Sequence, residues 1–249
     1  MTAGPAVQDR SFATAEELAC HAADWTVALA RASEGRFAIC LSGGSTPKRL
    51  YELLAAPARM TQFPWRRAHW FWGDERFVPH EDPQSNFRMA AEALLRHAPV
   101  PPENIHAIPT EGMSAEAAAI RYEAELNRFY GADALAGERP LFDLTLLGLG
   151  EDGHIASLFP NSTTLGESRR WAVPVIGESS VDRITLTYPA LESSRVTAFL
   201  VVGERKRGVL ARVRAGDPAL PATRLHSAGE VFWLTDRAAA TAAPALAPE

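Results

Sequence analysis

The sequence predicts an α/β protein with a three-layer, mostly parallel, Rossmann-like sheet and helices on both of its faces, folded as a single domain over residues 1–249. Short apolar runs of strand length alternate with segments of helical periodicity, and several of these runs end in glycine-rich turns. Neither an internal repeat nor a linker divides the chain. Apolar runs without alternation are typical of parallel strands that are buried on both faces.

The elements follow in order along the chain. Residues 1–12 are expected to be loose, and Thr14 with Glu17 three residues later forms a capping box for a helix that runs to about Ala32. The other helices are expected near residues 46–54, 86–97, 114–130 and 204–214, and the strands or extended pieces at 37–41, 69–72, 105–109, 142–147, 171–176, 183–187, 196–202 and 230–234. The alanine- and proline-rich tail, residues 241–249, is expected to be loose.

Composition and charge limit the class of protein. The chain is 47% hydrophobic and 22% charged, as is ordinary for a globular protein, and its net charge of −5 argues against nucleic acid or an anionic membrane as the main partner. No apolar run approaches the roughly 18 residues that span a bilayer. Cys20 and Cys40 fit neither a metal site nor a disulfide framework. We therefore expect a cytoplasmic protein, a monomer or small homo-oligomer, that holds any anionic ligand with local cations and backbone donors.

The most informative stretch is FDLTLLGLGEDGHIASLFP, residues 142–160. Its apolar first half predicts a buried strand, and its three glycines allow a tight turn that delivers Asp152 and His154 just past the carboxyl end of that strand. Ligands bind at this edge in open α/β sheets. A histidine in a loop is most often solvated or structural, but a glycine-rich turn with acidic residues after a buried strand favours a functional loop.

A second block, LSGGSTPKRLYELL at residues 41–54, joins a strand to a helix through a turn of small residues. Thr46 is expected to cap the helix and Pro47 to occupy its first position. Free N–H groups at the start of the helix, together with nearby hydroxyl groups, form an anion cradle that favours phosphate over a plain capped turn. The cradle comprises Ser42, Gly43, Gly44, Ser45 and Thr46. It matches neither a Walker loop nor GxGxxG, so no nucleotide is implied.

Two further blocks place charges after buried strands. Asp74, Glu75 and Arg76 follow an aromatic strand, and they form either a surface salt-bridge cluster or, as the parallel with the His154 loop favours, part of a shared cleft. Ser85 is expected to cap the next helix, with Asn86 near its start. Lys206 is expected in the first turn of a helix, where a cation is unfavourable to the helix dipole unless it serves a ligand.

Together these blocks resemble the 6-phosphogluconolactonases, in the wider family that includes the glucosamine-6-phosphate deaminases. The resemblance is carried, in order over most of the chain, by LSGGSTPKRLY, WFWGDERFVP, SNFRMA, LLGLGEDGHIASLFP, RITLTYPAL and FLVVGERKRGVL. It implies hydrolysis of a small phosphosugar lactone, 6-phospho-D-glucono-1,5-lactone, to 6-phosphogluconate in the oxidative pentose phosphate pathway. It also implies that neither a metal nor an organic cofactor is needed.

The resemblance implies roles for individual residues. Lactone opening needs an activated water, a stabiliser of the carbonyl oxyanion and a hold on the phosphate. His154 is the implied general base, and Asp152 orients it or stabilises the imidazolium, a contact that only the turn allows because residues i and i+2 cannot meet in this way along a strand. Arg76, Lys206 and the turn at residues 43–46 hold the phosphate or the oxyanion, and the division between these tasks stays open.

Three other residues receive roles through the resemblance. Arg183, which opens the RITLT strand, is a further cation candidate. Asp74 and Asn86 could bind sugar hydroxyls.

Two alternatives remain beside the lactonase interpretation. In an amino-sugar-phosphate deaminase or isomerase of the same fold, a glutamate follows the histidine by five residues, whereas this chain has Phe159, and an aromatic residue stands where this chain has Arg76. Both departures favour the lactonase. A non-enzymatic sugar-phosphate sensor would need the phosphate cradle but no general base.

Overall fold

A seven-stranded parallel sheet forms the centre of the protein, in a computed structural model that describes residues 7–240. Its strand order is β1-β10-β9-β6-β2-β3-β5, and every pairing within it is parallel. The strands are β1 (Val7–Phe12), β2 (Phe37–Leu41), β3 (Ala68–Trp72), β5 (Ile105–His106), β6 (Phe142–Leu147), β9 (Ser194–Val201) and β10 (Glu230–Asp236). The predicted α/β class and mostly parallel sheet are confirmed.

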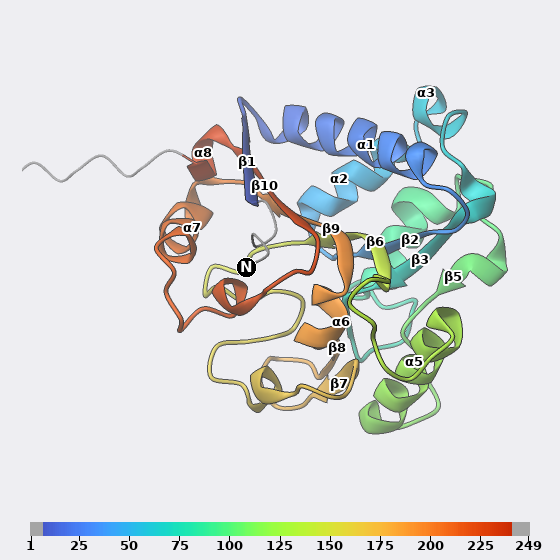
Figure 1. Ribbon diagram of the computed structural model, residues 1–249, viewed down its shortest axis with the longest axis vertical. Coiled ribbons are helices and arrows are strands. Elements are labelled where there is room, and N and C mark those ends of the chain that lie inside the picture. Colours follow the sequence, from blue (N-terminus) through green and yellow to red (C-terminus); the bar gives the residue numbers. More distant parts are fainter. Residues whose placement is uncertain (1–6, 241–249) are drawn as a thin grey trace, which may run out of the picture.

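Helices cover both faces of this sheet (Figure 1), which gives the predicted three layers. One face carries α1 (Ala15–Ala32) and α2 (Ser45–Leu54), and the other carries α5 (Ala115–Tyr130) and α6 (Tyr188–Glu192). The remaining helices are α3 (Pro57–Met60), α4 (Asn86–Ala90, continued by a π-helical turn at Ala91–Leu95), α7 (Arg207–Arg214) and α8 (Arg237–Ala240). No helix within residues 7–240 is both long and apolar enough to cross a membrane.

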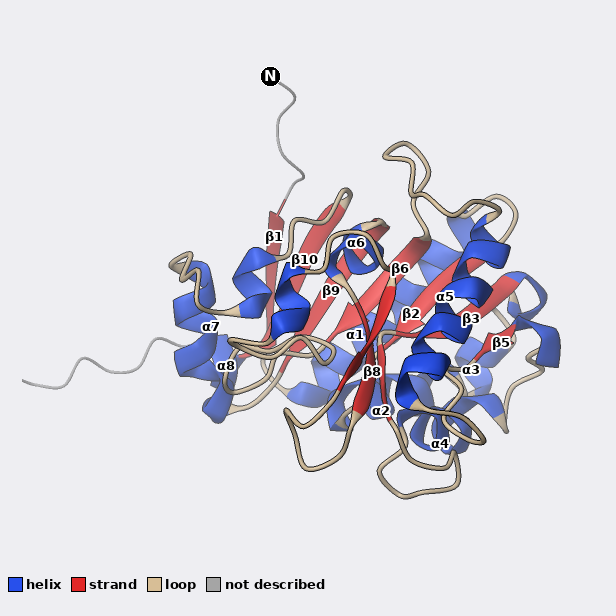
Figure 2. Cartoon of the chain, turned by 90° about the horizontal axis from the view of Figure 1, so that it is seen from below, coloured by secondary structure: helices blue, strands red, loops and turns tan. Residues whose placement is uncertain are grey.

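A second, smaller sheet was not predicted. It consists of β4 (Asp74–Arg76), β8 (Arg183–Leu186) and β7 (Ala172–Val175), joined in antiparallel pairs in the order β4-β8-β7. Figure 2 shows β8 crossing in front of the main sheet, on the side that also carries α5. The charged residues that follow β3 therefore form a short strand with fixed register instead of a free loop.

The core forms where apolar runs meet the sheet. All five residues of β2 are buried, as a strand covered by helices on both faces requires. Trp70, Trp72 and Phe71 of β3 are almost completely buried in the same core. Burial of one such large apolar side chain stabilises the fold by about 1.5–3 kcal/mol. This rigid centre fixes the strand ends from which the polar loops emerge.

Three local predictions were wrong. Residues 7–12, expected to be loose, form the edge strand β1 with alternating exposed and half-buried side chains, because β10 supplies a complete partner strand. Thr46 does not cap α2, because Gly44 is the N-cap residue and the helix already begins at Ser45. Lys206 lies in a 3₁₀ turn before α7 and not within an α-helical first turn. The expected loose tail, residues 241–249, lies outside the described residues.

The first helix shows how closely capping follows the sequence. Thr14 caps α1, its side-chain oxygen accepting a hydrogen bond from the Glu17 N–H at 3.1 Å. The Glu17 carboxylate accepts from the Ala13 N–H instead of from Thr14 itself, so only half of the predicted capping box is present. The helix ends at Ala32, as expected.

Candidate active site

Four loops meet at the carboxyl ends of four neighbouring parallel strands, β9, β6, β2 and β3. Between β2 and β6 the order of connections reverses, and this is the place where open α/β sheets bind ligands. The loops enclose a pocket of about 670 Å³. Its position matches the edge at which the sequence placed its polar blocks.

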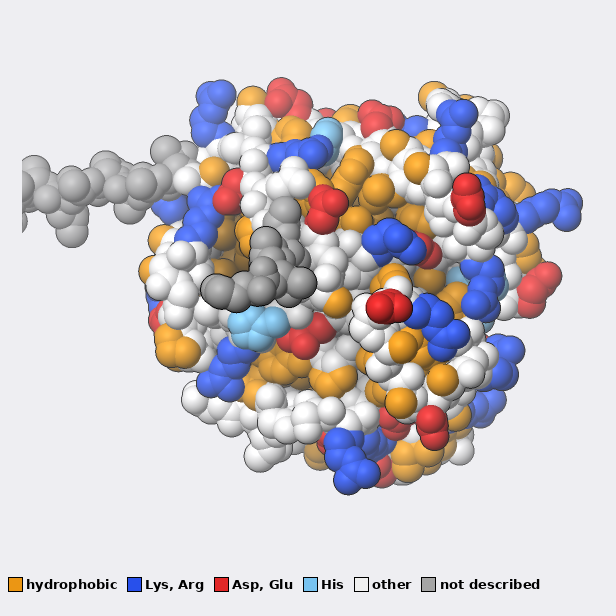
Figure 3. Space-filling model, viewed as in Figure 1, with side chains coloured by type: hydrophobic (Ala, Val, Ile, Leu, Met, Phe, Trp, Pro, Cys, Tyr) orange, Lys and Arg blue, Asp and Glu red, His pale blue; other side chains and the backbone are white. Residues whose placement is uncertain are grey.

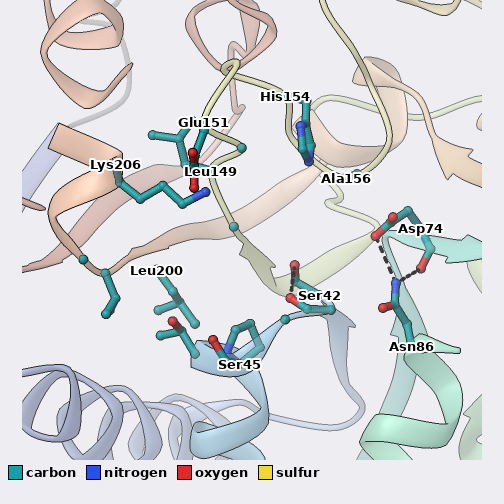
Figure 4. Close-up of a pocket in the computed structure, with 18 of the residues that line it drawn as sticks. Ser42, Ser45, Asp74, Asn86, Leu149, Glu151, His154, Ala156, Leu200 and Lys206 are labelled. Atoms are coloured by element: carbon teal, nitrogen blue, oxygen red, sulfur yellow. Dashed lines mark hydrogen bonds between the residues drawn. The ribbon is translucent and has the colours of Figure 1, made fainter. Parts of the chain in front are cut away.

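The pocket brings together all of the predicted site residues except Asp152. It is lined by Ser42, Gly43, Gly44, Ser45, Thr46, Asp74, Arg76, Asn86, His154, Arg183 and Lys206, among others. Figure 4 shows Lys206 and Ser45 on one side of the pocket and Asp74 and Asn86 on the other, with Ser42 between the two sides.

His154 and Asp152 form a hydrogen-bonded pair. Nδ1 of His154 lies 2.6 Å from Oδ1 of Asp152, and the same oxygen accepts from the His154 N–H at 3.1 Å. Burial opposes ionisation of this carboxylate, but these bonds and the nearby imidazole outweigh it and lower the pKa of Asp152. Because an ionised carboxylate can only accept, Nδ1 carries a proton, and in the neutral imidazole Nε2 then keeps a free lone pair. The predicted contact between Asp152 and His154, which only a turn allows, is therefore present.

The loop after β6 requires glycine at two positions. A Cβ at Gly150 would lie 2.1 Å from Nδ1 of His154 and 2.5 Å from Oδ1 of Asp152, so a larger residue would occupy the space of the pair. Gly153 has φ +88°, in the left-handed region that other residues avoid. The glycines thus let His154 approach Asp152 across a tight turn.

The turn after β2 is fixed from both sides. The Tyr51 hydroxyl accepts from the Ser42 N–H at 3.0 Å and donates to the Ser42 carbonyl at 2.8 Å. Gly44 adopts φ +104° and leaves the start of α2 without a side-chain cap, so the first N–H groups of the helix stay available for an anion. A Cβ at Gly43 would overlap the Asn86 side chain.

The opposite wall is a network around Asp74, which is buried. Its Oδ2 accepts from Ser157 Oγ at 2.7 Å and lies 3.7 Å from Nη1 of Arg183. Asn86 Nδ2 donates to the Asp74 carbonyl at 2.9 Å, and its Oδ1 accepts from Nη1 of Arg76. Asn86 therefore connects Asp74 to Arg76 within the pocket wall.

A buried carboxylate supports this wall from behind. Glu75 accepts hydrogen bonds from the N–H groups of Arg76, Asn86 and Phe87, each at 2.7 Å, and from Ser85 Oγ at 3.1 Å. Burial raises the pKa of Glu75, against the effect of these donors. Glu75 thus docks the start of α4 on β4.

Comparison with known proteins identifies the family of this chain. The family profile described as glucosamine-6-phosphate isomerases/6-phosphogluconolactonase matches residues 13–233. The chain belongs to this family. It is 43% identical to a 6-phosphogluconolactonase of Nostoc sp. over 83% of this chain and 84% of the relative. Among solved structures, it resembles the devB protein (TM-score 0.85, 32% identity, 94% and 98% of the two chains) and 6-phosphogluconolactonase from Trypanosoma cruzi (TM-score 0.81, 30% identity, 96% and 97%).

Two residues that contact the site, Ser157 and Tyr51, were not predicted from the sequence. Ser157 fixes Asp74, and it follows Ala156, a pocket residue with φ +48° whose left-handed backbone marks a strained turn. Tyr51 holds the turn after β2 at Ser42. Both residues lie inside sequence blocks that carry the family resemblance, and this position was the only sign in the sequence that they belong to the site. A hydroxyl group has no spacing pattern that would single it out.

Phe159 stands beside the histidine of this family member. The ring centroid of Phe159 lies 4.8 Å from that of His154. The guanidinium carbon of Arg183 lies 5.4 Å from the Phe159 centroid. An apolar ring here can neither donate nor accept a proton from the imidazole. The second acid-base group that the deaminase alternative needs at this position is therefore lacking.

Proposed function

We propose that this protein hydrolyses 6-phospho-D-glucono-1,5-lactone to 6-phosphogluconate, in the oxidative pentose phosphate pathway. The observation that carries the proposal is His154, which is hydrogen-bonded to Asp152 and lines one pocket together with cationic side chains and an uncapped helix start. The names of the relatives support it, since the 6-phosphogluconolactonase of Nostoc sp. and that of Trypanosoma cruzi each align with most of the chain.

The proposed reaction begins at Nε2 of His154. This nitrogen takes a proton from water as the water oxygen attacks C1 of the lactone, a step for which general-base catalysis typically contributes about 10²–10⁴ in rate. Asp152 stabilises the imidazolium through the 2.6 Å contact. The tetrahedral intermediate then expels the ring oxygen, which receives the proton from His154, and the C1 acid ionises to a carboxylate.

In this proposal, the turn after β2 and Lys206 bind the phosphate group. The helix start supplies N–H donors, and the hydroxyls of Ser45 and Thr46 line the same side of the pocket. No ion pair or hydrogen bond within residues 7–240 occupies the Lys206 ammonium. Asp74 is proposed to bind a sugar hydroxyl, and Asn86 to hold Arg76.

A direct assay tests the proposal. Purified protein is mixed with freshly generated 6-phosphogluconolactone and acid release is followed, while glucosamine 6-phosphate is tested in parallel for ammonia. We expect acid release well above the spontaneous rate and no ammonia. His154→Ala should lower kcat by at least about 100-fold and leave KM within a few fold, because the side chain acts on water and not on binding. Ammonia release would favour the deaminase alternative, and binding without turnover would favour a sensor.

We further propose that the protein works in the cytoplasm, as a monomer or small homo-oligomer, without nucleic acid. The net charge of −5 supports the absence of nucleic acid, and basic and acidic side chains are interspersed over the face in Figure 3 without forming a broad patch of one sign. Size-exclusion chromatography with light scattering measures the oligomeric state directly.

A further inference from the structure

Two arginines of the pocket lie directly opposite each other. Arg76 of β4 and Arg183 of β8 are register partners in the antiparallel pair, so both side chains leave the same face of the small sheet. Like charges placed directly opposite destabilise a sheet. Burial lowers the pKa of Arg183, and Arg76 lowers it further against the opposing effect of Asp74. An anion bound between or beside the two guanidinium groups would offset this repulsion.

The protein does not fully supply that anion. The nearest carboxylate oxygen, Oδ2 of Asp74, lies 3.7 Å from Arg183 Nη1 and already accepts from Ser157. Glu75 directs its oxygens to the start of α4. The hydrogen bonds of Arg76 and Arg183 use oxygens of Asn86, Gln84, Ser179 and Ser157, all of which are neutral.

Each guanidinium keeps donors for a ligand. Within residues 7–240, Nη2 of Arg76 and Nη2 of Arg183 have no hydrogen-bond partner. One face of the Arg183 guanidinium lies near the Phe159 ring, which leaves its edge for hydrogen bonding. Both residues line the pocket. Two N–H forks at one place suit a carboxylate, whose two oxygens accept in parallel.

This cationic wall adjoins the phosphate cradle at Gly43, which lies against Asn86, and is separate from Lys206 and Ser45. The arginines bond to Asn86 and Asp74, which Figure 4 places across the pocket from Lys206 and Ser45. His154 and Ser42 lie between the two sides. A ligand that satisfies both ends carries two anionic groups, one at each end of its chain.

We propose that Arg76 and Arg183 form a second anion subsite, which takes the carboxylate created when the lactone opens, so that the pocket binds its product more tightly than a phosphosugar with an uncharged C1. This inference rests on the proposed function. The donors that stabilise the C1 oxyanion during attack remain in place when C1 becomes a carboxylate, so retention of product follows from stabilisation of the intermediate. The enzyme is therefore subject to inhibition by 6-phosphogluconate.

Calorimetry with two matched ligands tests the subsite. 6-Phosphogluconate and glucitol 6-phosphate have the same open six-carbon chain and phosphate, and they differ at C1 as carboxylate and alcohol. We expect wild-type protein to bind 6-phosphogluconate at least about tenfold more tightly, as charge-assisted hydrogen bonds predict. The same order should hold for competitive inhibition of lactone hydrolysis.

Two variants separate the ends of the pocket. Arg183→Met keeps an apolar stem beside Phe159 and should bring the ratio of the two dissociation constants toward one, chiefly by weakening 6-phosphogluconate. Lys206→Met, the matched control, should weaken both ligands by a similar factor and preserve the ratio. Equal affinity of wild-type protein for both ligands would overturn the subsite, a result that needs no variant to fold. If lactone hydrolysis persists in that case, the proposed function stands without product retention; if hydrolysis is absent as well, both fail.

Discussion

A side chain at position 150 would occupy the space in which His154 and Asp152 meet. The Cβ of such a residue would lie 2.1 Å from Nδ1 of His154, closer than any non-bonded contact allows. Gly148, two residues earlier in the same loop, has room for a Cβ, because its nearest neighbour would be Ser42 Oγ at 3.9 Å, an ordinary van der Waals distance. The two glycines therefore form a matched pair for testing the histidine–aspartate contact.

We expect Gly150→Ala to lower kcat for lactone hydrolysis by at least about 100-fold, because it displaces His154, the proposed general base, from the Asp152 carboxylate. The affinity for 6-phosphogluconate should change less than about threefold, since the phosphate cradle, Lys206 and the Arg76–Arg183 wall are unchanged. Gly148→Ala should retain most of the activity. Steady-state kinetics and calorimetry on both variants measure these effects, and equal kcat values for the two variants would contradict the importance of the contact.

Individual site residues were predictable where chemistry depends on rare residue types. An imidazole in a glycine-rich turn and cations after buried strands are unusual enough to be found in the sequence, and the structure places His154, Arg76 and Lys206 in one pocket. Ser157 and Tyr51 were not predicted, because their roles depend on which distant groups their hydroxyls meet. That information resides in tertiary contacts between segments far apart in the sequence.

At the scale of elements, α4 is joined to β4 by one buried carboxylate. Glu75 receives three backbone N–H groups and the Ser85 hydroxyl, although burial raises its pKa. Glu75→Gln keeps the shape but replaces one acceptor oxygen with an amide that donates. We expect a loss of about 1–3 kcal/mol in the free energy of unfolding, as for a buried donor left unpaired.

Urea denaturation followed by tryptophan fluorescence measures this loss. Ser85→Ala is the control, because it removes one donor to Glu75 and the cap of α4 but leaves the backbone bonds in place. It should cost less than Glu75→Gln. A Glu75→Gln variant as stable as wild type would show that this carboxylate does not hold the two elements together.

The wrong predictions at this scale have local causes. The segment VQDRSF is too polar to indicate a buried strand, and it forms an edge strand only because β10 offers a partner. At α2, Gly44 reaches φ +104° and so permits the helix to begin one residue before the expected cap. Buried strands such as β2 and β6 were predicted well, because an apolar run carries its own signal.

At the scale of the whole molecule, a histidine pair lies at the sheet edge formed by β3 and β5, outside the pocket. His69 Nδ1 lies 3.0 Å from His106 Nε2, and His106 Nδ1 lies 2.6 Å from Glu125 of α5. Burial, with help from the charge of His106, lowers the pKa of His69 to about 4. Unfolding restores an ordinary pKa near 6.5 and thus favours proton uptake.

Stability should therefore fall as the pH drops from about 6.5 toward 4, because the unfolded chain binds the extra proton first. Since His69 is only half-buried, the discounted loss is about 1 kcal/mol, or about 2–4 °C in Tm. Thermal unfolding at pH 7 and pH 5 measures it. His69→Gln should reduce the difference in Tm between the two pH values, and the exposed His97→Gln should not. Equal pH slopes in His69→Gln and wild type would remove His69 as the cause.

The pairing of β1 also governs when the fold can be completed during synthesis. Val7–Phe12 bonds to Glu230–Asp236, so β1 is synthesised more than 200 residues before its partner strand. Until then its backbone groups must be satisfied by water, which the polar, alternating sequence tolerates without exposing a sticky apolar surface. The polar alternation that kept β1 from being predicted as a strand is thus also expected to lower the tendency of the unpaired segment to aggregate.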